Sequence, residues 1–123
     1  MTGQSPLKIL VAEDDELIGE LLGEMLAGMG HEVCAIEVTE AGAVVAARQS
    51  RPDLLIVDIH LNPGCGIAAV DAIQHVRPVP HILVSGNIAS LRARRPDAVM
   101  LEKPYTLVAL CCAMRRARDS GKG

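Results

Sequence analysis

The chain has 123 residues, of which half are hydrophobic and 22% are charged, and its formal net charge is −3 at pH 7. These values are typical of one globular domain, and they argue against a disordered chain or a protein that binds nucleic acid directly. Tyr105 is the one aromatic residue, no apolar run approaches a membrane span, and the first residues lack the basic and apolar regions of a signal peptide. We therefore expect a cytoplasmic protein with neither membrane nor nucleic-acid partners.

Apolar runs and helical spacing in the first half of the chain predict alternating strands and helices. In chain order they are a strand over residues 8–12, a helix over 16–29, a strand over 31–38, a helix over 40–49 and a strand over 54–58. Asp15 is placed to cap the first helix, Gly30 to end it, and Thr39 to cap the second.

The second half repeats the alternation after a loop rich in proline and glycine at residues 62–66. The pattern predicts a helix over 67–76, a strand over 81–84, one or two helical turns over 88–94, a strand over 98–101 and a helix over 106–118. The expected inner stripe of the last helix is Leu107, Leu110, Cys111 and Met114, and residues 119–123 form a polar tail.

Five short strand–helix units predict a doubly wound α/β fold whose sheet is mostly or wholly parallel. We expect a single domain over residues 1–123, with a core from about residue 7 to residue 118. Ligands of such sheets bind beyond the carboxyl ends of the strands. Polar residues that directly follow strands are therefore the candidates for function.

Asp58 ends the third strand, after an unbroken apolar run that is typical of a strand buried on both faces. Glu13 and Asp14 follow the first strand, Ser85 the fourth and Lys103 the fifth. Because all these strand ends face one edge of the sheet, we expect the five side chains to lie close together. Each has an ordinary explanation when taken alone, as a helix start, a turn or a loop lysine, and only their joint placement favours a shared site.

Three clustered carboxylates repel one another unless a cation lies among them, and oxygen-only ligands at a solvent-facing edge suit Mg²⁺ or Mn²⁺. Lys103 and Ser85 would add positive charge and a hydrogen-bond donor for phosphoryl oxygens. Asp58 is then a nucleophile whose product is an aspartyl phosphate. The second strand offers only Glu40 near this edge.

Response-regulator receiver domains, the phosphoacceptor half of two-component systems, have motifs that resemble KILVAEDDELI, PDLLIVDIHL, ILVSGN and MLEKPY of this chain. The resemblance extends over residues 7–117 and implies a flavodoxin-like strand order 2-1-3-4-5. It implies Asp58 as the phosphoacceptor, Ser85 as the switch hydroxyl and Lys103 as the phosphate partner. It further implies that Glu13, Asp14, Asp58 and the backbone carbonyl of His60 bind Mg²⁺, and that the peptide bond between Lys103 and Pro104 is cis.

The resemblance also implies a role. We expect a single-domain response regulator that accepts a phosphoryl group from a histidine kinase or a histidine phosphotransfer protein and loses it by slow autodephosphorylation, without being an enzyme. Its output would be a contact with a downstream protein or onward phosphotransfer, and we expect a monomer or a weak dimer. The alternative is a protein-interaction module that uses the receiver fold without phosphorylation.

Two enzyme classes are disfavoured by particular residues. A phosphatase with an aspartate nucleophile usually needs a second acid two residues later, where this chain has His60. A dinucleotide-binding enzyme would need GxGxxG after the first strand, where this chain has acids. A zinc site built from His60, Cys65 and the acids lacks the usual ligand spacing.

The chain departs from the receiver pattern at two places. Met100 occupies the switch position where receivers usually carry Tyr or Phe, so no phenol is present there to form a new hydrogen bond. The stretch from Ser85 to Lys103 is short, which predicts a shortened fourth helix.

His60 and Asn87 are expected to flank the phosphoryl site, each two residues after a site residue. We hypothesise that His60 modulates autodephosphorylation; an exposed loop histidine without a role is the alternative. The first helix is expected to present Ile18, Leu22 and Leu26 to a partner.

Overall fold

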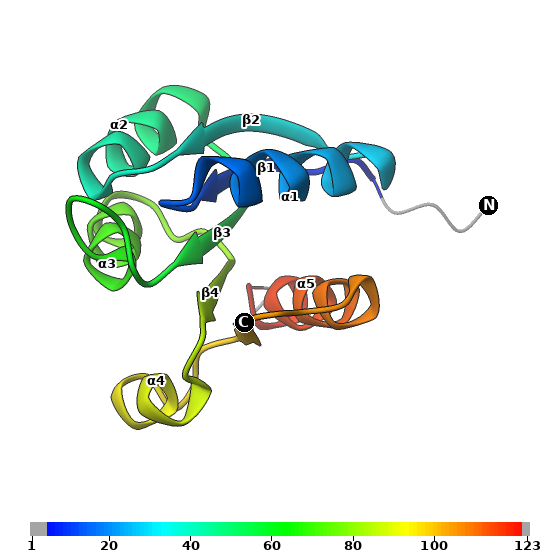
Figure 1. Cartoon of the computed structure of the whole chain (residues 1–123). Coiled ribbons are helices and arrows are strands. Elements are labelled where there is room, and N and C mark those ends of the chain that lie inside the picture. The colour runs from blue at the N-terminus through cyan, green and yellow to red at the C-terminus, as the bar shows by residue number, and fades with distance from the viewer. Residues whose placement is uncertain (1–4, 122–123) are drawn as a thin grey trace.

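The computed structural model describes residues 5–121, which form one parallel five-stranded sheet between two layers of helices (Figure 1). The strands are β1 (Lys8–Ala12), β2 (Glu32–Glu37), β3 (Leu54–Asp58), β4 (His81–Ser85) and β5 (Met100–Glu102). The helices are α1 (Glu16–Gly28), α2 (Glu40–Ser50), α3 (Gly66–Val76), α4 (Ile88–Arg94) and α5 (Leu107–Gly121). The strand order is β2-β1-β3-β4-β5, which confirms the predicted fold and topology.

Alternate residues of the central strands supply two separate cores, because successive side chains of a strand point to opposite faces. Leu55 and Val57 of β3 pack under α2, α3 and α4, whereas Leu54 and Ile56 pack under α1 and α5. All four side chains are at most 1% exposed. The continuous apolar run before Asp58 therefore reflects a strand that is covered on both faces, and β3 lies between β1 and β4.

The caps expected from the sequence are present. One carboxylate oxygen of Asp15 accepts hydrogen bonds from the backbone N–H groups of Leu17 and Ile18 at 3.0 and 3.2 Å. The hydroxyl of Thr39 accepts from the N–H of Gly42 at 2.9 Å. Gly30, just after α1, has a φ of 95°, which a residue with a side chain rarely adopts. These local signals fix where the first two helices begin and where α1 ends.

The predicted apolar surface of α1 is wrong in two of its three residues. Leu22 and Leu26 are 4% and 0% exposed, because they lie four residues apart on the face that packs on the sheet. Leu17 and Leu21, on a neighbouring side of the helix, are 65% and 51% exposed, and Ile18 is 36% exposed. The exposed apolar surface of α1 is therefore turned from the predicted one by about one residue.

The last helix also differs from the prediction. It runs to Gly121 instead of residue 118, and residues 122–123 of the predicted tail lie outside the described part of the chain. Leu107 is 50% exposed, and the inner stripe is formed by Leu110, Ala113, Met114 and Ala117. The prediction missed the two alanines of this stripe. Their small side chains allow α5 to approach β4 and β5 closely, but they do not stand out in a pattern of large apolar residues. Within residues 5–121, no helix combines the length and the apolar character that crossing a membrane requires.

Helix α4 is shortened to seven residues, as the sequence predicted. The side-chain oxygen of Asn87 caps it by accepting from the N–H of Ser90 at 3.1 Å. At its other end, Arg95 forms an ion pair of 2.6 Å with Asp71 of α3. Both partners are substantially exposed, so this pair contributes at most about 1 kcal/mol.

His31 is buried before β2, and the protein's stability is expected to depend on its protonation. Its Nδ1 accepts a hydrogen bond of 3.0 Å from the backbone N–H of Leu7, and burial, reinforced by the positive charge of Arg118, lowers its pKa. The folded protein therefore favours the neutral ring. As the pH falls, the free energy of unfolding should start to decrease near pH 6.5, the pKa of this histidine in the unfolded chain. It should keep decreasing until the pH is below the lowered pKa of the folded state.

Urea unfolding of the wild type and of His31→Asn between pH 8 and pH 5 tests this expectation. Asn can keep an acceptor for Leu7 and does not titrate, so the stability of the wild type relative to the variant should decline as the pH falls. A difference that stays constant over this range would contradict the assignment.

Candidate functional site

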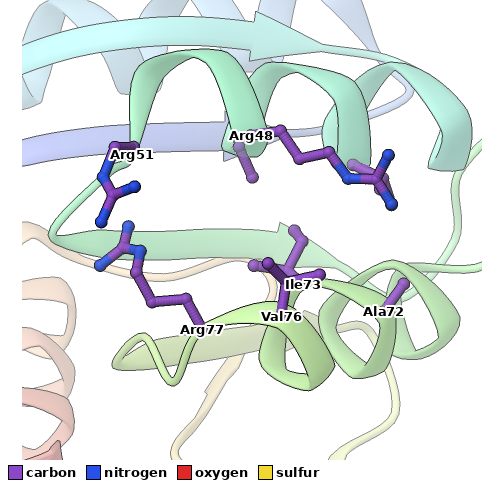
Figure 2. A pocket seen from close by; sticks show the side chains of 8 residues that line it. Arg48, Arg51, Ala72, Ile73, Val76 and Arg77 are labelled. Atoms are coloured by element: carbon purple, nitrogen blue, oxygen red, sulfur yellow. The ribbon is translucent and has the colours of Figure 1, made fainter.

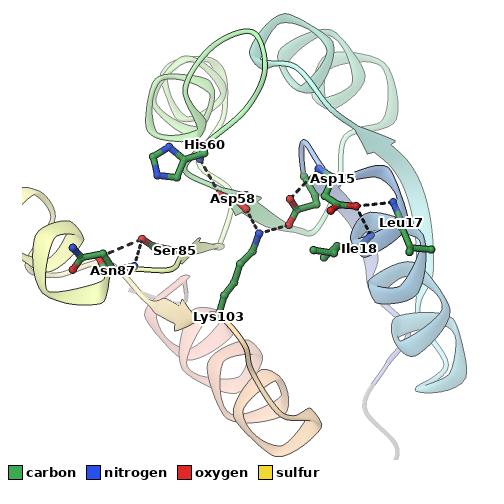
Figure 3. A network of polar contacts seen from close by, with 9 residues as sticks. Asp15, Leu17, Ile18, Asp58, His60, Ser85, Asn87 and Lys103 are labelled. Atoms are coloured by element: carbon green, nitrogen blue, oxygen red, sulfur yellow. Dashed lines mark hydrogen bonds and ion pairs between the residues drawn. The ribbon is translucent and has the colours of Figure 1, made fainter.

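The carboxyl ends of β1, β3, β4 and β5 carry the acids, the hydroxyl and the lysine singled out in the sequence, and Lys103 meets Asp58 there (Figure 3). Glu13 and Asp58 are each 4% exposed and Ser85 is 1% exposed, whereas Asp14 is exposed to solvent. Asp58 is in register with Val84 of β4, so its carboxylate lies at the end of the central strand. A buried carboxylate requires compensating partners, and the structure supplies them.

Lys103 is the main partner of the two buried acids. Its Nζ lies 2.8 Å from Oε1 of Glu13, and it also donates a hydrogen bond to Oδ2 of Asp58. The other oxygen of Asp58, Oδ1, accepts from the backbone N–H of His60 at 2.8 Å. Both oxygens of Asp58 are thus held in place, one by a charge and one by a backbone donor (Figure 3).

A backbone hydrogen bond positions Lys103. Its N–H donates to the carbonyl oxygen of Ser85 at 2.9 Å, which ties the end of β5 to the end of β4. The peptide bond between Lys103 and Pro104 is cis, as the resemblance implies. Lys103 directly follows β5, and its ammonium group reaches Asp58.

The electrostatics of the cluster follow from burial. Burial raises the pKa of Glu13 to about 7, although its contact with Lys103 opposes the rise. Burial alone would lower the pKa of Lys103, but its hydrogen bonds to Asp58 and Glu13 outweigh this effect, so its pKa lies above the ordinary value. The ammonium group is therefore charged at every physiological pH, while Glu13 is close to the point of taking up a proton.

The donor set is suited to a divalent cation. Carboxylate oxygens of Glu13, Asp14 and Asp58 lie within 4.8 Å of one another, and opposite oxygens around Mg²⁺ are about 4 Å apart. With all three acids ionised, the single ammonium of Lys103 leaves two negative charges uncompensated. The residues present therefore fit an oxygen-bound dication with little movement.

No zinc cluster is supported in the described part of the chain. Between residues 5 and 121, the three acids are the only group of three or more His, Cys, Asp or Glu side chains close enough to share an ion. His60 and Cys65 are bridge partners on the backbone but contribute no side chain to that group.

Ser85 and Asn87 interact with each other rather than with Asp58. The hydroxyl of Ser85 accepts from the N–H of Asn87 at 2.9 Å and donates to the carbonyl oxygen of Asn87 at 3.2 Å. Figure 3 shows both residues to one side of the contact between Lys103 and Asp58. The side chain of Asn87 is engaged in capping α4, so neither polar group contacts the carboxylate.

His60 contributes its backbone to the site, and its imidazole is exposed and points away from Lys103 (Figure 3). Met100, at the switch position, is 8% exposed and packs in the core beneath α4. Tyr105 is partly buried against the other core, and burial raises the pKa of its hydroxyl.

The contacts that hold the loop after Asp58 were not predicted from the sequence. Glu40, noted only as the acid nearest the second strand, accepts a hydrogen bond from the N–H of Cys65 at 2.9 Å. Gly66 passes so close to β3 that a Cβ there would lie 2.0 Å from the carbonyl oxygen of Asp58. The sequence shows a glycine followed by an apolar helix, but this pattern does not reveal that the glycine lies beside the carbonyl oxygen of Asp58.

A depression lies away from this site, between the C-terminal ends of α2 and α3 (Figure 2). It has a volume of about 50 Å³ and an apolar floor that includes Ala47 and Ile73. Figure 2 shows Arg51 and Arg77 extending toward each other across it. Arg77 donates a hydrogen bond of 2.8 Å to the carbonyl oxygen of Pro52, and cations at helix C-termini complement the helix dipole, so these arginines have a structural explanation.

Comparison with known proteins places these residues in a family context. The family model described as the response regulator receiver domain matches residues 9–113. PdtaR of Mycobacterium tuberculosis, a transcriptional regulatory protein, is 34% identical over 120 residues, which are 91% of this chain and 57% of that protein. The phyllosphere-induced regulator PhyR of Methylorubrum extorquens is 33% identical over 102 residues, which are 80% of this chain and 38% of that protein.

A protein-glutamate methylesterase/protein-glutamine glutaminase of Anaeromyxobacter dehalogenans is 35% identical over 107 residues, or 83% of this chain and 31% of that protein. The chain thus spans between about a third and somewhat over half of the length of these relatives.

Solved structures give the same match in three dimensions. The REC domain of the response regulator PhyR of Erythrobacter litoralis superimposes with a TM-score of 0.84 at 26% identity, covering 93% of this chain and 91% of that one. The response regulator PhyR of Brucella abortus superimposes with a TM-score of 0.87 at 25% identity, covering 97% of this chain and 51% of that one.

Proposed function

The chain belongs to the response regulator receiver family, and from this premise we propose that Asp58 accepts a phosphoryl group from a phosphohistidine. Receiver domains take such groups from histidine kinases, and for this chain the donor would be a histidine kinase or a histidine phosphotransfer protein. The observation that carries the proposal is the contact of the Lys103 ammonium with Asp58 beside the acidic cluster.

The chemistry follows from the charges on these groups. An oxygen of the Asp58 carboxylate attacks phosphorus, a new O–P bond forms, and the N–P bond of the donor breaks. The donor imidazole keeps the electron pair of the broken bond and takes up one proton from solvent. Lys103 already lies at the carboxylate, where its ammonium can hydrogen-bond to the phosphoryl oxygens as charge accumulates on them.

Receiver domains generally bind Mg²⁺ in an acidic pocket, and in this chain the ion would be held by Glu13, Asp14, Asp58 and the backbone carbonyl of His60. When bound, it would supply positive charge to the carboxylates and to the phosphoryl oxygens. Glu13, whose burial raises its pKa to about 7, would then remain ionised at neutral pH.

The protein surface beside the site is suited to a docking donor. A depression of about 420 Å³ is lined by Ile18, Lys103, Pro104 and Tyr105. Leu17 and Leu21, on the same helix as Ile18, are also largely exposed. We propose that a helix of the donor packs against this apolar surface, so that its phosphohistidine reaches Asp58. The output would be a further protein contact or onward phosphotransfer.

Treatment with acetyl phosphate and Mg²⁺, followed by intact-mass measurement, tests the proposal. The wild type is expected to gain one phosphoryl group, and Asp58→Asn is expected to gain none, because an amide oxygen is a poor nucleophile. Omission of Mg²⁺ should reduce the yield strongly. A protein that stays unmodified but retains its fold would favour the phosphorylation-independent interaction module.

Loss of the phosphoryl group by hydrolysis is expected to be slow, and the hypothesis that His60 modulates it can be tested on the same product. The half-life of the phosphorylated wild type should differ from that of His60→Ala. Equal half-lives would contradict the hypothesis. The imidazole points away from Lys103 in Figure 3, so a difference between the half-lives would mean that a side chain in this outward position still affects hydrolysis.

A further inference from the structure

Glu40 is bonded twice to the loop that connects β3 with α3, here called the β3–α3 loop (residues 59–65). Its backbone N–H donates to the carbonyl oxygen of Pro63 at 3.1 Å, and its Oε1 accepts from the N–H of Cys65 at 2.9 Å. Glu40 is the first residue of α2, so this helix, which is distant from Asp58 in the sequence, holds the end of the loop through these two hydrogen bonds. The family motifs assign no role to this side chain.

The grip is transmitted to the site by backbone pairing within the loop. Cys65 forms an antiparallel bridge with His60, and the N–H of Gly66 donates to the carbonyl oxygen of Ile59 at 2.8 Å. His60 in turn donates its N–H to Asp58. Holding Cys65 therefore holds His60, whose carbonyl oxygen is the backbone ligand in the proposed metal site.

Gly64 brings the loop into unusually close contact with Glu40. A Cβ at residue 64 would lie 2.3 Å from the Cβ of Glu40 and 2.8 Å from its Oε1, and Gly64 has a φ of +114°. Only glycine fits both the space and the backbone conformation. The loop is thus seated on Glu40 by shape as well as by hydrogen bonds.

We propose that Glu40 is a positioning residue that fixes the β3–α3 loop in the conformation presenting the carbonyl of His60 to the divalent cation. The proposal rests on the proposed function of this edge of the sheet. The group that matters is the acceptor oxygen, because it binds a backbone N–H; its negative charge is secondary. A glutamine, which keeps the acceptor and loses the charge, should therefore replace Glu40 with little effect, and an alanine should not.

Thr39 supplies a matched control on the same helix end. Its hydroxyl caps α2 at Gly42, so Thr39→Ala should weaken the start of α2 to a similar extent as Glu40→Ala. It leaves both bonds between Glu40 and the loop intact. A property changed by Glu40→Ala but not by Thr39→Ala therefore reports on the loop rather than on general stability.

The experiment uses amide NMR of the full chain, first without metal and then in a Mg²⁺ titration. In the metal-free protein, amide exchange at Cys65 should be about fivefold faster in Glu40→Ala, as expected for one lost hydrogen bond. The Mg²⁺ dissociation constant should rise about tenfold, as is typical for loss of a residue that orients a metal ligand. Glu40→Gln and Thr39→Ala should match the wild type in both measurements.

Two results would overturn the inference. One is Glu40→Ala binding Mg²⁺ like Thr39→Ala, and the other is Glu40→Gln being as impaired as Glu40→Ala. Failure of the proposed function is distinguishable, because the wild type would then neither bind Mg²⁺ nor accept a phosphoryl group, and the inference would fall with it. A wild type that does both while Glu40→Ala is unchanged overturns the inference alone.

Discussion

Replacing Lys103 with methionine is expected to slow phosphorylation of Asp58 by about 10²–10³-fold, the usual effect of removing one group that stabilises transferred charge. Methionine keeps the apolar stem and removes the ammonium group that contacts Asp58 and Glu13. The two acids, each 4% exposed, would then face each other without a protein cation. The rate of phosphorylation by acetyl phosphate at saturating Mg²⁺ provides the measurement.

The same substitution should lower the free energy of unfolding by about 2 kcal/mol, less than for a fully buried pair because the lysine side chain is 27% exposed. Added Mg²⁺ should restore part of the loss, since it supplies charge to the same carboxylates. Lys8→Met is the matched control, because Lys8 lies at the opposite end of the sheet and its ammonium group donates to the backbone carbonyl of Ser50. If Lys103→Met and Lys8→Met are phosphorylated at the same rate, the assigned role of Lys103 is wrong.

Gly66→Ala is expected to lower the free energy of unfolding by about 3 kcal/mol and to abolish phosphorylation. The added Cβ would lie 2.0 Å from the carbonyl oxygen of Asp58 and 2.8 Å from the Cα of Ile59, and backbone atoms cannot move aside as a flexible side chain does. The junction between β3 and α3 must shift, and Asp58 with it. Urea unfolding measures the first effect and intact mass the second.

Gly28→Ala provides a control with the opposite sign. Gly28 ends α1, and a Cβ there would meet no atom within 4 Å, so the variant should gain up to about 1 kcal/mol from helix propensity alone. Its phosphorylation should equal that of the wild type. Equal stability of Gly66→Ala and Gly28→Ala would show that the close contact with Asp58 is not a constraint.

The features predicted correctly from the sequence are those with local causes. The fully buried strand Leu54–Asp58, the cap at Asp15 and the end of α1 at Gly30 each depend on a few neighbouring residues. The convergence of Glu13, Asp58 and Lys103 was predictable because parallel strands end at one edge.

The features that were missed depend on contacts between distant segments. The sequence pattern placed Leu22 and Leu26 on the surface of α1, but which side of an apolar helix meets the sheet is decided by the packing of the whole layer. The hydroxyl of Ser85 contacts Asn87 because α4 begins close by, and the loop rests on Glu40 because α2 lies beside it. Neither contact produces a periodic pattern in the sequence from which it could be predicted.

The two outer strands of the sheet bear on how the protein behaves when it is crowded. Strand β5 has three residues, and β2 begins and ends with glutamate, so neither border offers a long neutral row of free backbone groups. A second copy that pairs with β5 could form only a few backbone hydrogen bonds, and a copy that pairs with β2 would bring glutamate side chains close together. Strand-by-strand growth into fibres is thereby discouraged, and encounters between copies are left to the helical faces.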